Sequence, residues 1–491
     1  MKSLFVSSGL SLAFSMAALA ANAFDESSWD SSQIIRRDVA IIGGGAAGTY
    51  ATFRLKDHGK SVVLVEKTGR LGGHAVTYED PITGGSVDYG VQVYDNNSIV
   101  RNFFSRLNTP LADFSFASFG RPIYADFKEG VLLNLTSGGL GQDYINELNK
   151  YPYLNDGIEL PNPVSEDLLL PWVDYINKYH LDYSTAVATL ARPAITGDLL
   201  NILTLYVFND LNHLMLQEES GAAVINANHD NSQLYRNAVP ELQPDLFLNS
   251  TVVAGYRSTR KRDGVRLIIQ TPAGFKLIIA KQLILGIPPV LENMRSFGLD
   301  SHEHDVLSNI YGLPYYGGVV SNTGLASGFS YKNSAANTTY NVAEIPSVVG
   351  FTPSTVDGLF FYWYNSPEPV SQQQIEGEAR DAIKLLQKLT NSTTQPEPRF
   401  LAFADFAPYQ LRASADSIRN GFYDDMYGLQ GHRNTWYTGT LFVTGSSQVW
   451  NNTEVMLPEI LAAINASKSL REAAWILLSH TLKRLGNIVG E

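Results

Sequence analysis

Short apolar runs separated by polar turns recur along the chain and predict alternating strands and helices. Residues 39–42 are apolar and rich in β-branched side chains, and a run of glycines follows them. Residues 46–55 continue with helical spacing, and residues 61–65 form a second apolar run. A strand, a tight turn, a helix and a second strand in this order predict a parallel α/β unit.

The turn after the first strand has the spacing G-x-G-x-x-G, with Gly43, Gly45 and Gly48 at the three glycine positions. The first glycine permits the tight turn, the second leaves room for a pyrophosphate, and the third lets the helix pack closely on the strand. Glu66 ends the second strand, where its carboxylate can accept hydrogen bonds from ribose hydroxyls and would repel a phosphate. The pattern therefore predicts a site for FAD or NAD rather than NADP.

Two later parts of the chain are predicted to return to the same sheet. Residues 247–256 predict a strand, and residues 265–270 and 275–280 predict a hairpin around a Pro/Gly turn. Residues 281–287 predict a further buried strand that stops at prolines. Residues 435–439 and 441–445 predict a strand ending in Thr-Gly, followed by a helix over 453–478 with Thr453 as its N-cap.

The segments between these returns predict a second domain of mixed α+β type. Helical runs at 165–180, 183–190 and 197–216 are interrupted by prolines, and aromatic residues cluster from 311 to 409. Residues 375–389 have the spacing of an amphipathic helix, and residues 362–364 alternate as on a strand. These segments suit either a pocket for an apolar ligand or ordinary core packing.

Two further motifs carry a resemblance to a known family. Arg70-Leu71-Gly72-Gly73-His74 follows Glu66, and Asp88-Tyr89-Gly90-Val91-Gln92-Val93 follows a short strand. Together with the glycine turn, they resemble the FAD-dependent amine oxidase and phytoene desaturase superfamily, and more closely its fungal β-cyclopiazonate dehydrogenase family. The resemblance covers the nucleotide-binding segments well and the middle of the chain poorly.

The resemblance implies an α/β fold in which three chain segments assemble a Rossmann-like FAD-binding domain beside an α+β substrate domain. The third return favours FAD over NAD, because flavoproteins of this superfamily place a helix N-terminus there, facing N1 and the C2 carbonyl of the flavin. The expected divisions are a signal peptide at 1–23, FAD-binding segments at 24–110, 241–290 and 434–491, and substrate segments at 111–240 and 291–433.

The motifs and the resemblance also assign residues to the FAD site. The assigned residues are Gly43, Gly45, Ala47, Gly48, Glu66, Lys67, Arg70, Gly73, His74, Val253, Gly445, Glu454 and Val455. Arg70 can reach the pyrophosphate with its planar guanidinium. Val253 is expected to contact the adenine side through its backbone, with Val252 as the alternative. His74 stands where the wider superfamily often has Arg, and we expect it to line the cofactor, with proton transfer as the alternative.

Composition narrows the classes of function. The 491 residues carry a formal net charge of −12 and are 44% hydrophobic, which predicts an ordered multidomain protein and argues against nucleic acid as a partner. Cysteine is absent, so disulfides and cysteinyl attachment of a flavin are excluded. His302 and His304 flank Glu303 in a polar segment that we interpret as a solvated loop; no metal site is predicted.

The N-terminus predicts entry into the secretory pathway. Lys2, an apolar run over residues 4–20 and small residues before position 24 have the pattern of a signal peptide cleaved after Ala23, and an uncleaved anchor is the alternative. No membrane span is expected after cleavage, so the protein would be secreted or lumenal. Glycosylation sequons lie at Asn96, Asn134, Asn249, Asn337, Asn391, Asn451 and Asn465.

These observations together predict an FAD-dependent oxidoreductase that removes hydride from an activated carbon of a hydrophobic small molecule. The resemblance implies fungal secondary metabolism, with oxidation coupled to cyclisation in some members, and molecular oxygen as electron acceptor. Tyr94, Tyr315, Tyr364 and Trp436 are candidate pocket residues, and no catalytic base is predicted. The alternatives are a flavin-dependent double-bond isomerase, a secreted amine oxidase and a redox-inactive flavin-binding protein.

Overall fold

The structure is a computed structural model, and it describes residues 23–135, 139–155, 157–190 and 196–466. All but the last residue of the predicted signal peptide lies outside the described residues, as does the end of the predicted C-terminal helix beyond residue 466. Within the described ranges, every helix is too short or too polar to cross a bilayer.

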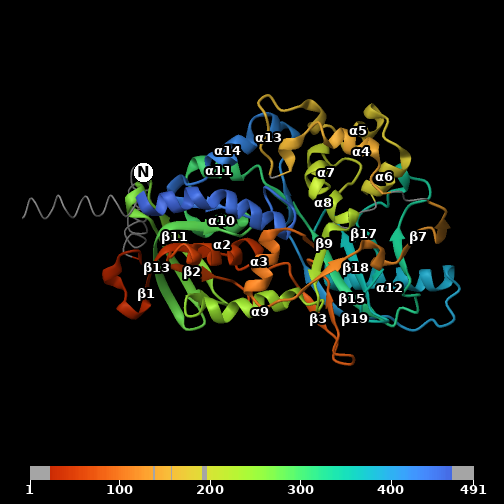
Figure 1. The fold of residues 1–491 in the computed structure, drawn as a ribbon, viewed down its shortest axis with the longest axis horizontal. Coiled ribbons are helices and arrows are strands. Elements are labelled where there is room, and N and C mark those ends of the chain that lie inside the picture. Colours follow the sequence, from red (N-terminus) through yellow and green to blue (C-terminus); the bar gives the residue numbers. More distant parts are fainter. Residues whose placement is uncertain (1–22, 136–138, 156, 191–195, 467–491) are drawn as a thin grey trace, which may run out of the picture.

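Strands from three separated parts of the chain form the first of two seven-stranded sheets. Its strands, in order, are β10 (Leu246–Phe247), β2 (Val62–Val65), β1 (Ile34–Ile42), β13 (Gly274–Leu285), β12 (Val265–Thr271) and β11 (Thr251–Arg257), and β21 (Thr435–Tyr437) pairs with the end of β13. β1 runs parallel to β2 and β13, and β21 runs parallel to β13. The predicted three-segment Rossmann-like fold is thereby confirmed (Figure 1); the residue numbers proposed for the domain boundaries stay predictions.

The sheet is buried on both faces where its central strands are apolar, at residues 39–42 of β1 and 62–65 of β2. Val39 and Ile41 of β1 pack into one core cluster with Phe53 of α2 (Ala46–Asp57). Ala40 and Ile42 point the other way into a second cluster. This alternation explains why residues 39–42 form a continuous apolar run, as parallel strands covered on both faces do.

Some predicted elements are divided in the structure. Residues 247–256, predicted as one strand, belong to β10 and β11 on opposite edges of the sheet. The predicted helical runs at 165–180 and 197–216 are each broken into shorter helices.

Other predicted elements have different bounds. Residues 275–280 and 281–285 are one continuous strand, β13, rather than two. Residues 441–445 form turns instead of a strand, and the C-terminal helix begins at residue 446, seven residues before the predicted start. Thr453 is therefore not an N-cap: it lies inside that helix, and its hydroxyl donates to the carbonyl of Val449.

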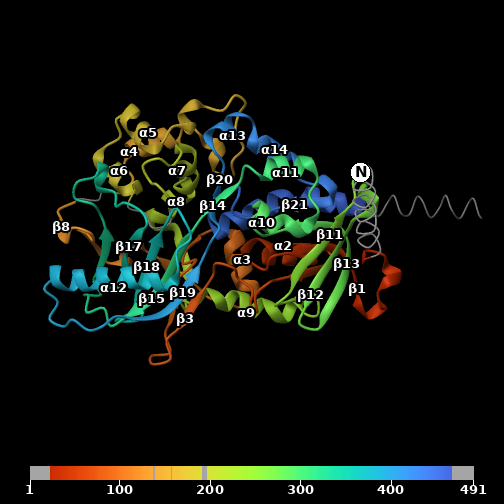
Figure 2. The same cartoon turned by 180° about the vertical axis from the view of Figure 1, so that it is seen from behind.

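A second seven-stranded sheet supports the other half of the molecule (Figures 1 and 2). Its strands, in order, are β19 (Arg399–Asp405), β15 (Tyr315–Ser321), β18 (Phe360–Asn365), β17 (Ser347–Pro353), β16 (Phe329–Asn333), β7 (Arg121–Asp126) and β8 (Val131–Leu133). α12 (Gln372–Leu389) covers one face, where Ile383 and Leu386 pack with Tyr362. The other face carries Trp363 and Tyr315.

Smaller elements connect and cover the two sheets. The remaining strands are β3 (Thr77–Glu79), β4 (Ser86–Asp88), β5 (Tyr94–Asp95), β6 (Leu111–Phe114), β9 (Ala223–Asn226), β14 (Tyr311–Leu313) and β20 (Tyr409–Arg412). The other labelled α-helices are α3 (Ser98–Arg106), α4 (Gln142–Leu148), α5 (Trp172–Tyr179), α6 (Tyr183–Leu190), α7 (Thr204–Asp210), α8 (His213–Gln217), α9 (Asn231–Leu242), α10 (Leu291–Met294), α11 (Ser301–Leu307), α13 (Ala415–Arg419) and α14 (Phe422–Gly428). α4 to α7 gather above the second sheet (Figures 1 and 2).

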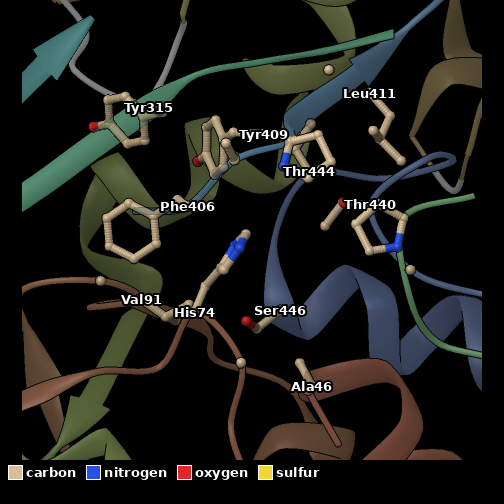
Figure 3. A pocket seen from close by; sticks show the side chains of 18 of the residues that line it. Ala46, His74, Val91, Tyr315, Phe406, Tyr409, Leu411, Thr440, Thr444 and Ser446 are labelled. Atoms are coloured by element: carbon tan, nitrogen blue, oxygen red, sulfur yellow. The ribbon is translucent and has the colours of Figure 1, made fainter. Parts of the chain in front are cut away.

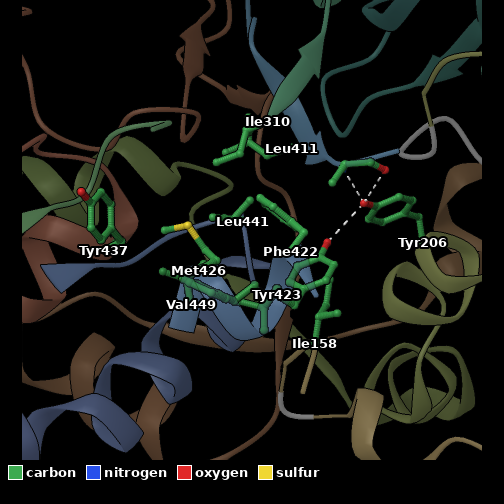
Figure 4. Packing of buried hydrophobic residues seen from close by; sticks show 14 of the residues in the cluster. Ile158, Tyr206, Ile310, Leu411, Phe422, Tyr423, Met426, Tyr437, Leu441 and Val449 are labelled. Atoms are coloured by element: carbon green, nitrogen blue, oxygen red, sulfur yellow. Dashed lines mark hydrogen bonds between the residues drawn. The ribbon is translucent and has the colours of Figure 1, made fainter. Parts of the chain in front are cut away.

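A buried cluster ties these helices to the C-terminal segment (Figure 4). Met426 of α14 packs in the same cluster as Leu441 and Val449. The Tyr423 hydroxyl donates to the Tyr206 hydroxyl (3.2 Å), so α14 and α7 also share a buried hydrogen bond. This packing fixes the segment that leads into the C-terminal helix.

Candidate functional site

A cavity of about 1680 Å³ lies between the two sheets. Gly43 and Glu66 from the first chain segment, Gly445 from the last and Tyr315 from the second sheet all line it. Ligand pockets usually measure roughly 300–1000 Å³. This cavity therefore has room for a long cofactor and a second molecule together, and the segments predicted to converge on one ligand do share a single cavity.

The glycine turn leaves an opening in the cavity wall at one position. A Cβ on Gly43 would lie 2.7 Å from Ile287 Cγ2, and a Cβ on Gly48 would lie 1.9 Å from the Gly43 carbonyl oxygen. A Cβ on Gly45 would meet nothing closer than Gly73 Cα at 3.8 Å. Gly43 and Gly48 are thus required by the protein's own packing, whereas Gly45 keeps free space for a ligand.

The N-terminus of α2 opens onto the same space. Its N-cap is Gly45, which offers no side chain to cap the helix, and Ala46 and Ala47 line the cavity. The first backbone N–H groups of a helix lack intrahelical partners and carry partial positive charge. A phosphate group suits this position.

Glu66 holds the turn in place from the end of β2. Its Oε2 accepts a hydrogen bond from the Gly44 amide (2.7 Å), and its Oε1 accepts from the amide and hydroxyl of Thr68 (both 2.7 Å). A carboxylate offers about four acceptor positions. Glu66 lines the cavity and has capacity left for a ribose hydroxyl.

Arg70 shapes the loop that follows. Its Nη1 donates to the carbonyls of Leu71 (3.2 Å) and Ala75 (3.1 Å). Its Nη2 donates to the Gly73 carbonyl (2.7 Å). Arg70 and Lys67 both line the cavity, so they place positive charge beside the glycine turn. The predicted reach of Arg70 to a pyrophosphate stays a prediction.

His74 projects from this loop into the middle of the cavity (Figure 3). Its ring meets Phe406 edge-on at a centroid distance of 5.2 Å and lies 5.9 Å from the ring of Tyr409. Burial lowers the pKa of His74 to about 4, and the positive charges of Arg70 and Lys67 act in the same direction. The imidazole is therefore neutral at physiological pH.

Aromatic side chains of the second sheet, of β20 and of the loop between β19 and β20 form the wall opposite the glycine turn. Tyr315 stacks on Tyr409 at 4.7 Å between ring centroids, and Phe406 lies 5.9 Å from Tyr315. Trp363 lines the same cavity. Such a wall can hold a flat apolar molecule and exclude water.

The C-terminal helix enters the cavity at its N-terminus. Gly445 and Ser446 line the cavity there. The side-chain oxygen of Gln448 accepts hydrogen bonds from the amides of Thr444 and Gly445 (both 3.2 Å), which fixes the first turn. The helix therefore presents its positive end to the cavity, as predicted for the end of the cofactor that gains negative charge.

Buried carboxyl groups flank this helix. Asp95 and Glu218 line the cavity and hydrogen-bond to each other, which requires one proton between them. Burial raises the pKa of Asp95, although the hydrogen bonds from Glu218 and Ser447 partly offset it. Asp210 also lines the cavity.

Several predicted site residues lie elsewhere. Val253 is 41% exposed and does not line the cavity, whereas Val252 does, because the strand is irregular between positions 252 and 254. Val455 is 60% exposed on the outer side of the C-terminal helix. Glu454 turns away from the cavity and binds Arg54 and Tyr50 of α2. The placement of Glu454 and Val455 follows from the earlier helix start, which moves the cavity-facing turn to residues 445–449.

Of the four predicted pocket residues, Tyr315 lines the cavity and the other three pack in cores. Tyr94 stacks on Trp450 at 5.5 Å. The Tyr364 hydroxyl donates to Glu378 of α12 (2.7 Å). Trp436 donates from its indole nitrogen to Gln282 (2.9 Å).

The sequence-based prediction missed Trp363, Phe406 and Tyr409. Strand alternation would have separated Trp363 from Tyr364, because neighbouring residues on a strand face opposite sides. The sequence around Phe406 and Tyr409 contains no pattern that would distinguish residues lining a cavity from residues packed in a core.

A cluster outside the cavity combines side chains of metal-binding type. Single ligand-type atoms of Asp300, Glu303 and His432 lie within 4.8 Å of one another. Glu303 there accepts hydrogen bonds from Arg257 and Arg433, so guanidinium groups already neutralise it. We interpret the cluster as an ion-pair network. The segment predicted as a solvated loop is in fact α11, and Glu303 is fully buried.

The sheet with its parallel central strands, the glycine turn and the large cavity are typical of dinucleotide-dependent oxidoreductases. The chain is 80% identical over 467 residues to FAD-dependent oxidoreductase dbaF of Emericella nidulans, covering 95% of this chain and 100% of that protein. It is 31% identical over 447 residues to β-cyclopiazonate dehydrogenase of Aspergillus oryzae, covering 88% of this chain and 95% of that protein. The chain belongs to this family of FAD-dependent oxidoreductases.

Two further comparisons agree with the fold. Residues 41–107 match the model of an NAD(P)-binding Rossmann-like domain. The crystal structure of a CLA-producing fatty acid isomerase from P. acnes superposes with a TM-score of 0.68 at 17% identity, covering 86% of this chain and 98% of that one. At this identity, the similarity concerns the fold alone.

The residues around the cavity fit FAD. Gly45 leaves the space that a Cβ would fill, the uncapped start of α2 suits a pyrophosphate, and Glu66 keeps a free acceptor position. Residues 444–449 present a second helix N-terminus to the same cavity. The Trp450 indole nitrogen donates to the Ala46 carbonyl (3.2 Å), so the starts of the two helices lie side by side. The protein is an FAD-dependent oxidoreductase, and these segments are the ones that can hold the cofactor.

Proposed function

We propose that this oxidoreductase removes hydride from an activated carbon of a largely apolar small molecule in fungal secondary metabolism. The observation that carries the proposal is the shared cavity, in which an aromatic wall of Tyr315, Phe406 and Tyr409 faces the elements that suit FAD. FAD, when bound, supplies the two-electron acceptor.

The protein's own residues would bind, orient and shield the substrate. The aromatic wall provides flat apolar contact, and its burial keeps water away from the reacting carbon. A relative named β-cyclopiazonate dehydrogenase supports a metabolite as substrate. Oxidation coupled to cyclisation is a further part of this proposal. Molecular oxygen as the final electron acceptor belongs to the same proposal.

Anaerobic mixing of purified holoenzyme with candidate substrates tests the reaction class. The panel comprises flat aromatic alcohols, indole alkaloids, terpenoids, fatty acids and amines. We expect members of the first groups to bleach the flavin absorbance, and readmitted oxygen to restore it with release of peroxide. A substrate that is converted without net oxygen consumption would identify an isomerase. Bound flavin that no compound bleaches would contradict the proposal.

We also propose that the protein enters the secretory route. Six of the seven sequon asparagines are exposed, and Asn451 is half-buried, so glycans could be attached at most of them without disturbing the core. Endoglycosidase treatment of the protein expressed in a fungal host should increase its electrophoretic mobility. Unchanged mobility, together with an intact N-terminal methionine, would contradict this destination.

A further inference from the structure

His74 places a polar side chain in the middle of the cavity, between the glycine turn and the aromatic wall (Figure 3). Within the described residues, its imidazole contacts the rings of Phe406 and Tyr409 and makes no hydrogen bond to the protein. A neutral imidazole has one donor and one acceptor nitrogen. The side chain is half-buried and open to the cavity, so a ligand group bound there can take the place of water at its ring nitrogens.

We propose that His74 recognises the substrate by hydrogen-bonding to a hydroxyl group on an otherwise flat, apolar and uncharged molecule. The inference rests on the proposed function and adds the chemical class of its substrate. A hydroxyl group both donates and accepts hydrogen bonds, so it can pair with either imidazole nitrogen.

The charges around His74 favour a neutral substrate over a cation. The same burial that lowers the pKa of His74 would disfavour a cationic group beside it. Arg70 and Lys67 of its own loop add positive charge on that side. An ammonium group placed against His74 would therefore lose solvation and meet repulsion.

The opposite wall disfavours an anion. Burial is the main cause that raises the pKa values of the Tyr315 and Tyr409 hydroxyls, and the negative charge of Asp210 raises both further, although the positive charge of Arg412 offsets part of the effect on Tyr409. The field of Asp210 therefore reaches the aromatic wall where the substrate would lie. A carboxylate in that place would be repelled, whereas a neutral ring with a hydroxyl would be tolerated.

Titration of oxidised holoenzyme with three ring compounds tests this inference. The probes are 2-naphthol, 2-methylnaphthalene and 2-naphthoate, and binding is followed by the change in the flavin absorption spectrum. For the wild type, we expect 2-naphthol to bind roughly tenfold more tightly than 2-methylnaphthalene, as one hydrogen bond provides. We expect 2-naphthoate to bind more weakly than 2-naphthol.

Two variants separate hydrogen bonding from packing. His74→Phe keeps a ring against Phe406 and should abolish the preference for 2-naphthol over 2-methylnaphthalene. His74→Gln keeps a donor and an acceptor and should retain part of the preference. His304→Gln changes an exposed histidine of α11 and should behave as the wild type.

Each other outcome overturns the inference. A preference that survives in His74→Phe, equal binding of the three probes to the wild type, or loss of FAD from His74→Phe would each exclude this role for His74. Failure of the proposed function would give a different result from these. Wild-type protein that contains no flavin would show no spectral change with any probe.

Discussion

Gly45 is the residue of the glycine turn whose missing side chain faces the cavity rather than the protein. Its neighbours in the motif, Gly43 and Gly48, face backbone atoms closely. Substitution of Gly45 should therefore affect the binding of FAD, whereas substitution of Gly43 or Gly48 should affect the stability of the fold.

Gly45→Val should abolish retention of FAD while the apoprotein stays folded. The backbone at Gly45 is extended (φ −73°), and the new Cβ would have only an ordinary contact at 3.8 Å. We expect the free energy of unfolding of the apoprotein to change by less than about 1 kcal/mol. Flavin absorbance of the purified protein and a urea unfolding curve measure the two effects.

Gly48→Ala is the matched control. Alanine normally stabilises a helix interior by about 0.5–1 kcal/mol relative to glycine. Here its Cβ would lie 1.9 Å from the Gly43 carbonyl oxygen, so we expect a loss of at least about 2 kcal/mol. A Gly45→Val protein that keeps its full flavin would contradict this account of the turn.

At the scale of single elements, the sequence predicted periodic segments well and cavity-facing residues poorly. The apolar run at 39–42 and the helix after Gly45 were predicted because local spacing determines both. The helix at 453–478 was misplaced because its true start, at residue 446, lacks a capping Ser, Thr, Asp or Asn at the N-cap position, where Gly445 stands. Tyr364 was predicted to line the pocket instead of Trp363. The strand pattern shows that the two side chains face opposite sides of the sheet, but which side is covered by α12 depends on tertiary packing.

Asp88 ends β4 and introduces a pH dependence that the sequence does not reveal. Its Oδ1 accepts hydrogen bonds from the Thr77 hydroxyl (2.5 Å) and the Asn231 amide (2.8 Å), which join the hairpin to α9. Burial raises the pKa of Asp88 to about 7. The folded state therefore binds a proton that the unfolded chain releases near pH 4.

Asp88→Asn should flatten the pH dependence of stability. A raised carboxyl pKa contributes stability that is present below about pH 4 and is lost as the pH rises through about 7. Asparagine keeps an oxygen for both hydrogen bonds and cannot ionise. We expect the variant to equal the wild type near pH 4 and to exceed it above pH 7 by at most about 4 kcal/mol in urea unfolding.

Asp80→Asn, in the same hairpin, should change the pH dependence of stability in the opposite direction. Hydrogen bonds from Thr83 lower the pKa of Asp80, so its contribution is present above the unfolded pKa and is lost as the pH falls. This variant should be less stable than the wild type at neutral pH and should approach it in acid. Parallel pH profiles for Asp88→Asn and the wild type would refute the assignment to Asp88.

At the scale of the whole molecule, the cofactor site depends on three segments that the sequence separates by more than a hundred residues. Motifs identified the three segments because each carries its own local pattern. The contacts that lock them together were not predictable, since partners such as Arg257 and Glu303 lie on different elements and have no fixed spacing. The same limit applies to the cavity wall, where Phe406 meets His74 only after the two sheets pack.

Glu303 joins the second and third segments through a largely buried network. Its carboxylate accepts from Arg257 of β11 at Oε1 (2.5 Å) and Oε2 (2.8 Å), and from Arg433, just before β21, at Oε2 (2.8 Å). Both Arg257 and Glu303 have fully buried side chains. Removing the negative charge would leave a guanidinium buried without its counter-ion.

Glu303→Gln should therefore destabilise the protein by about 3–5 kcal/mol, the usual cost of breaking a buried ion pair from one side. Chemical unfolding measures the loss, and Glu397→Gln, which breaks an exposed pair with Lys384 on α12, should change stability little. Because Glu303 lies outside the cavity, Glu303→Gln protein that remains folded should still bind FAD. Wild-type stability in Glu303→Gln would mean that β-sheet pairing alone, without this network, holds the C-terminal segment against the rest of the fold.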